Sequence, residues 1–235
     1  MAVTINGTAT ANNFGSAIGA GVPATFTYTA PAGTVGLVIV EGSDSTSSAA
    51  PTAVSYNGVA ATLIPNTFST NPNLVGGAQS SMWYLASPAT GSALTVSITY
   101  TQSVIGGAVA VLIPLLGVSS IAPFQTTTTA NNSNTGLTDT TAPLITPPAA
   151  TANDLYIGVV SVEIDTGTPT ATANGGTQLT NTTSRGSLIV GTSSLSGNGG
   201  SLGWTLSVAN PWVMSAVAFL APTSGGGTAP IAWIT

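Results

Sequence analysis

Short runs of β-favouring residues recur along the chain, each bounded by Gly, Pro, Asn or Ser. Two of them alternate with period two: residues 25–29 place both aromatic side chains on one face, and residues 94–100 are apolar at every second position. This alternation is typical of a strand with one buried face. Helix-favouring charged residues are nearly absent, because the chain has two Glu, one Arg and no Lys. The pattern predicts an all-β fold, an antiparallel β-sandwich.

Four other runs are apolar on both faces rather than on one. They comprise residues 35–40, 108–113, 155–162 and 213–220. Strands with this composition are covered on both sides. We expect a second sheet on one side and another subunit or a loop on the other.

The two halves of the chain repeat the same order of runs. Each half has an apolar run, an Asn-Gly pair, a second apolar run, an alternating run and a third apolar run. The Asn-Gly pairs begin at Asn57 and Asn174, which are 117 positions apart. Asn-Gly is a strong hairpin signal, because both residues accept a positive φ. We therefore predict one sandwich built from two similar halves, with a hairpin at each Asn-Gly pair.

The predicted boundaries follow changes in composition. Residues 1–124 form the first half and 151–222 the second, and the polar and Pro-rich stretch 125–150 connects them. Residues 223–235 are a Gly-rich linker followed by an apolar tail. The tail residues Pro230, Ile231, Trp233 and Ile234 are expected to dock, either on the chain's own sandwich or on a neighbouring subunit.

Seven of the 235 side chains carry charge, and His and Cys are absent. The missing residue types exclude disulfides, Cys or His metal sites, a Cys nucleophile and a Ser-His-Asp triad. Arg185 is the single basic side chain, so binding to a phosphate backbone is excluded. The most apolar stretch, residues 104–118, is interrupted by Pro114 and is too short to span a membrane as a helix. We expect no cofactor, no nucleic acid and no membrane partner.

The acidic residues offer a weak signal for chemistry. Glu163 and Asp165 are two positions apart on a predicted strand and would share a face, as a hydrolytic carboxylate pair or a Ca²⁺ site requires. Asp165 also precedes a Thr-Gly turn, and Glu41 and Asp44 occupy the corresponding strand end of the first half. We favour local turn hydrogen bonding for these acids and expect no enzymatic activity. Arg185 is expected to form an ion pair with one of the acids.

Tryptophan provides the alternative of a carbohydrate-binding surface. Trp83, Trp204, Trp212 and Trp233 could stack on sugar rings, whereas core or interface packing is the ordinary role of a tryptophan. Trp204 lies in an alternating run between two leucines, which favours packing.

The surface implied by this composition favours assembly. Residues 45–138 contain no charged side chain, so exposed positions there must be hydroxyl, amide or small apolar residues. Such a surface has little electrostatic repulsion between copies and loses no ion hydration when it is covered. We expect contact with copies of the same chain or with another large surface.

Three segments carry a resemblance: YNGVAATLI, SMWYLASPATGSALTVSITY and GGAVAVLIPLLGVSSIAPF. They resemble Gly/Thr/Ser-rich β-sandwich modules of bacteriophage virion proteins and bacterial surface proteins. The resemblance implies a jelly-roll-like sandwich that serves assembly or attachment, and it supplies no catalytic residues. Because the sequence starts without a secretion signal, we expect a virion protein assembled in the host cytoplasm.

The expected role is a capsid decoration (cement) protein that is oligomeric and binds the major capsid protein or other virion subunits. A tail or fibre component, a surface filament subunit and a carbohydrate-binding adhesion module remain alternatives.

Overall fold

The computed structural model describes most of the chain and contains strands but no helix in that part. The described residues are 1–15, 17–45, 50–70, 77–125, 130–134, 144–145, 151–165, 167–197 and 200–223. They form four antiparallel sheets, which confirms the all-β class. No helix among them could span a membrane.

Two sheets belong to the first half of the chain. The first inner sheet contains β1 (Thr4–Ile5), β2 (Thr10–Asn13), β4 (Gly36–Ser45), β7 (Thr62–Leu63), β8 (Ser69–Thr70), β9 (Gly77–Ala86) and β11 (Val104–Leu116). The first outer sheet contains β3 (Ala24–Tyr28), β5 (Ala53–Tyr56), β6 (Val59–Ala60) and β10 (Leu94–Thr99).

The second half forms the other two sheets. The second inner sheet contains β12 (Ala130–Asn134), β14 (Leu155–Glu163), β16 (Thr177–Ser184), β17 (Leu188–Ser196) and β19 (Trp212–Phe219). The second outer sheet contains β13 (Leu144–Ile145), β15 (Ala171–Asn174) and β18 (Leu202–Leu206). Residues 125–150, read from the sequence as a connection, thus supply β12 and β13.

Strand pairing is nested in the same way in both halves. In the first half β2 pairs with β11, β3 with β10, β4 with β9 and β5 with β6. In the second half β12 pairs with β19, β13 with β18 and β14 with β17. In each half, successive pairs fall alternately in the inner and the outer sheet.

The two Asn-Gly pairs behave differently. Asn57 and Gly58 both have positive φ, 53° and 73°, and they join β5 to β6 as the predicted hairpin. Gly175 has a φ of 84°, but β15 and β16 lie in different sheets. The hairpin predicted at Asn174 is therefore wrong: this turn is a corner between sheets, and β16 pairs with β17 instead.

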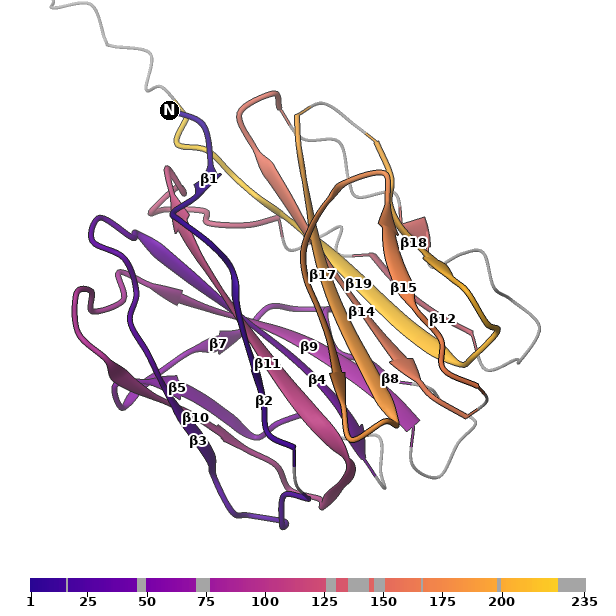
Figure 1. The fold of residues 1–235 in the computed structure, drawn as a ribbon. Helices are drawn as coiled ribbons and strands as arrows, with labels where there is room; N and C mark the ends of the chain where they lie inside the picture. Colours follow the sequence, from indigo (N-terminus) through magenta and orange to yellow (C-terminus); the bar gives the residue numbers. More distant parts are fainter. Residues whose placement is uncertain are drawn as a thin grey trace, which may run out of the picture.

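The inner sheets pack face to face and the outer sheets cover their other faces, so the molecule has four layers (Figure 1). On β4, Val38 and Val40 point toward the second half, whereas Leu37 and Ile39 point toward the first outer sheet. Each doubly apolar run lies in an inner sheet. Its second face is covered by the other half of the same chain, and not by another subunit or a loop as expected from the sequence.

Gly42 marks a close approach of the two inner sheets. A Cβ atom built at Gly42 would lie 2.5 Å from Val190 Cγ2 and 2.6 Å from Ser161 Oγ, both in the second inner sheet. Real Cβ atoms essentially never approach other heavy atoms this closely. Glycine at this position therefore allows the two halves to meet.

Gly42→Ala should lower the free energy of unfolding by about 1–3 kcal/mol, because the added methyl overpacks the central layer. The measurement is urea unfolding followed by circular dichroism. Gly19→Ala is the matched control, since Gly19 is exposed, has no positive φ and would place its Cβ 3.4 Å from the nearest side-chain atom. Equal stability of the two variants would contradict the close approach.

Candidate functional site

Three acidic side chains from the two halves come together at one end of the inner sheets. Asp44 lies on β4, Glu163 ends β14, and Asp165 follows two residues later. The pKa of Glu163 is raised to about 7, mainly by burial and then by the charges of Asp165 and Asp44, while a backbone hydrogen bond from Ala78 opposes them. The pKa of Asp44 is also raised, first by burial and then by Asp165, against a hydrogen bond from Ser187.

This acidic end does not form a metal centre in the described part of the chain. No group of three His, Cys, Asp or Glu residues there is arranged to hold a metal ion. Asp165 lies in the irregular segment after β14, and its backbone N–H donates to Asn210 Oδ1 at 2.9 Å, so the local turn hydrogen bonding stays a prediction. The described residues thus offer no three-ligand site for Ca²⁺, and the carboxylate pair of Glu163 and Asp165 stays an untested alternative.

Neutral hydrogen bonds join the two halves beside these acids. Asn13 Nδ2 donates to the Thr183 carbonyl at 2.8 Å, and Ser184 Oγ donates to Asn13 Oδ1 at 2.7 Å. Ser187 Oγ donates to the Gly106 carbonyl. The edge strand β2 and the turn between β16 and β17 are therefore held together without an ion pair.

Arg185 lies in that turn between β16 and β17. Its φ is 51° and that of Gly186 is 72°, as a tight two-residue turn between paired strands requires. The side chain is exposed, and its Cγ lies 3.4 Å from where a Cβ on Gly107 would be. No salt bridge of Arg185 is found with the described acids, so its ion pair remains a prediction.

Glu41 is the most deeply buried of the described acids, and the turn position predicted for it is wrong. It lies within β4, not at a turn, and none of its surface is exposed. Its side chain faces the first outer sheet, accepting hydrogen bonds from Ser81 Oγ at 3.0 Å and from the Tyr100 hydroxyl at 3.1 Å. Trp83 Nε1 donates to Ser81 Oγ at 3.0 Å, which extends the network.

Burial sets the ionisation of this carboxyl. Desolvation raises the pKa of Glu41 to about 7, and the hydrogen bonds to the carboxylate only partly oppose it. Burial and the neighbouring Glu41 charge raise the pKa of Tyr100 as well. The network is thus neutral under mildly acidic conditions and acquires a buried charge near neutral pH.

Three of the four candidate stacking tryptophans are unavailable to a ligand. Trp83, Trp204 and Trp212 are 7%, 1% and 2% exposed. Trp204 and Trp212 belong to the core between the second inner and outer sheets, and Gly191 provides the space for the Trp204 ring. Core packing is therefore the observed role of these three residues.

The remaining candidate residues belong to the tail. Pro230, Ile231, Trp233 and Ile234 lie outside the described residues, so their docking remains a prediction. The buried Glu41 network has no signal in the sequence, because an acid between Val40 and Gly42 is compatible with either face of a strand. Comparisons of the chain with protein-family models, curated proteins and solved structures find no match.

Glu41→Gln should make unfolding less dependent on pH. In the unfolded chain Glu41 ionises above about pH 4.5, whereas in the folded protein it stays protonated to about pH 7. The contribution of Glu41 protonation to the free energy of unfolding is complete below about pH 4.5 and is lost as the pH rises to about 7. The free energy of unfolding falls by on the order of 3 kcal/mol over this range.

The neutral amide cannot titrate, so the variant should retain stability across that range in urea unfolding. Glu163 titrates in the same direction and will leave a residual slope. Thr95→Gln, at an exposed position of β10, leaves every acid in place and serves as the control, which should keep the pH dependence of the natural chain. A slope for Glu41→Gln as steep as that of the natural chain would show that Glu41 is ionised in the folded state at low pH.

Proposed function

We propose that this chain is a structural protein of a bacteriophage virion, and that it decorates and stabilises the capsid through broad uncharged contacts. The supporting observation is the distribution of charge on the folded chain. Of the six charged side chains that are described, Glu41, Asp44 and Asp154 are buried and Glu163 is partly buried. Exposed charge in the described part is thus confined to Asp165 and Arg185.

The cost of covering such a surface is low. Ions lose favourable hydration when they are buried, whereas hydroxyl groups can exchange water for hydrogen bonds with a partner. Exposed apolar side chains add a favourable contribution, since Val22, Val59 and Ile105 are each more than half exposed. This surface suits lasting contact with virion subunits or with copies of the same chain.

The strand pairing supports the same proposal. We interpret each half as jelly-roll-like, because nested antiparallel pairs divided between two facing sheets are the pattern of that architecture. Jelly rolls occur in viral capsid proteins and also in lectins. The burial of Trp83, Trp204 and Trp212 favours assembly over carbohydrate binding.

The direct test is antibody labelling of purified particles in the electron microscope. Labelling over the shell supports capsid decoration. Labelling of the tail or fibres would contradict the capsid location, and particles without label would contradict the virion role. A decoration protein binds the assembled shell, so adding the purified chain to shells that lack it should raise the temperature at which they release DNA.

Association with the particle should also resist salt. Raising NaCl from about 0.1 M to about 1 M shortens the Debye length to about 3 Å and releases proteins held by exposed ion pairs. Because this chain has almost no exposed charge among its described residues, the amount that sediments with particles should not fall. Release by salt would contradict uncharged contacts, and an ion-pair-dependent decoration protein would serve as the control.

A further inference from the structure

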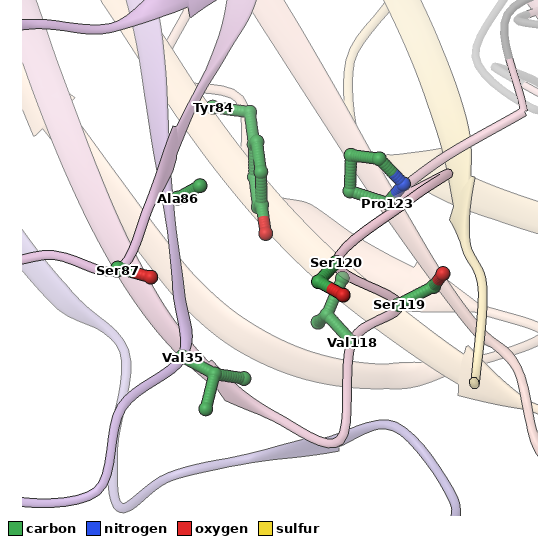
Figure 2. Close-up of a pocket in the computed structure, with 8 residues that line it drawn as sticks. All are labelled: Val35, Tyr84, Ala86, Ser87, Val118, Ser119, Ser120 and Pro123. Atoms are coloured by element: carbon green, nitrogen blue, oxygen red, sulfur yellow. The ribbon is translucent and has the colours of Figure 1, made fainter.

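A hollow of about 330 Å³ opens where the first inner sheet ends, and its lining carries no charged side chain. It lies between the end of β9 and the segment that follows β11. The lining residues are Val35, Tyr84, Ala86, Ser87, Val118, Ser119, Ser120 and Pro123. Figure 2 shows Tyr84 reaching across this space toward the segment that carries Ser119 and Ser120. The size is at the lower end of that of small-ligand sites.

Two large apolar side chains are exposed beside this hollow. Ile121, between the lining residues Ser120 and Pro123, is 95% exposed, and Val35 is 41% exposed. Val118 contributes a buried apolar wall. Large apolar side chains gathered around a concavity mark an interaction site.

The described chain leaves the fold beside this hollow. Ser119 N donates to the Leu220 carbonyl at 2.8 Å, and Leu220 N donates to the Pro123 carbonyl at 3.0 Å. Ala221 N then donates to Asp154 Oδ1 at 2.7 Å. Leu220 is thus hydrogen-bonded to two lining residues, and the last described residue, Thr223, follows it by three positions. Twelve residues of the sequence come after Thr223.

We propose that residues 228–235 of the same molecule bind in this hollow, with the Trp233 indole as the anchor. The segment has no charged side chain, which matches the neutral lining. Trp233 follows Thr223 by ten positions, and an extended chain of that length reaches about 30 Å. Tryptophan is a frequent anchor in apolar pockets, and its N–H can bond to one of the lining hydroxyls.

The same molecule is the favoured source of the segment. Residues 224–227, Ser-Gly-Gly-Gly, join the segment to Thr223, and a covalent link this short gives an effective concentration of about a millimolar. A second copy at micromolar concentration competes poorly with that value. This inference concerns the isolated chain and does not rest on the virion proposal, so either can fail without the other.

Tryptophan fluorescence of the full-length chain provides the test. Because Trp83, Trp204 and Trp212 are buried, acrylamide-accessible emission reports on Trp233. The natural chain should resist quenching. Ala86→Glu places a charge in the exposed part of the lining, so the emission of one tryptophan should become accessible to acrylamide. Adding Trp233→Phe to Ala86→Glu should remove this increase in accessible emission. Ala60→Glu, at an exposed alanine ending β6, is the matched control and should resist quenching like the natural chain.

Disulfide trapping gives a second readout in the full chain, which has no natural cysteine. Ser120→Cys combined with Ala232→Cys should form an intramolecular disulfide, whereas Thr27→Cys, on the exposed face of β3, combined with Ala232→Cys should not. Accessible Trp233 in the natural chain, or Trp233 that stays protected in a folded Ala86→Glu variant, would overturn the proposal. Disulfide-linked dimers in place of the intramolecular bond would overturn the assignment to the same molecule.

Discussion

The contact between the two inner sheets is the interaction on which the rest of this architecture depends. In this contact, the faces of β4, β9 and β11 that point away from the first outer sheet pack against the faces of β14, β17 and β19 that point away from the second outer sheet. Neither half therefore exposes its inner sheet to water. Burial of apolar surface is the main favourable contribution to folding, and here it is shared between two halves with the same nested pairing. Small residues keep the layer thin: Gly42 faces Val190, and Ser80, Ser161 and Ser215 take positions where larger side chains would separate the sheets.

This arrangement also explains where the few charged residues lie. Glu163 and Asp44 lie where the two halves meet, and Glu41 is buried between the two sheets of the first half. Asp154 is buried but accepts hydrogen bonds from Thr151 and from the Ala221 backbone. A buried carboxyl group is tolerated when it is hydrogen-bonded or protonated. Asp154 is hydrogen-bonded, and Glu41 is both hydrogen-bonded and, below about pH 7, protonated. The described surface is left almost without charged side chains, and the proposed assembly role rests on this property.

Much of the fold could be predicted because the signals were local. Period-two alternation placed a strand at residues 94–100, and Asn57-Gly58 placed a hairpin, since both depend on a few neighbouring residues. The candidate site was less accessible to sequence reasoning. Glu41 resembled a turn acid, yet it lies within a ten-residue strand, because β4 continues past Glu41 to Ser45. Asn174-Gly175 carries the same local signal as Asn57-Gly58. Because β16 pairs with β17 in the second inner sheet, this turn instead connects that sheet to β15 in the second outer sheet.

The sequence by itself determined that the chain is all-β, that four of its strands, β4, β11, β14 and β19, are buried on both faces, and which chemistries it lacks. These conclusions follow from residue type and spacing, which act over short distances. Only the tertiary structure decided what covers the doubly apolar strands, which acids come together, and that the chain leaves the fold beside a neutral hollow. Periodicity shows that a face must be buried but not against which partner, because apolar attraction has no direction. Long-range packing selects that partner.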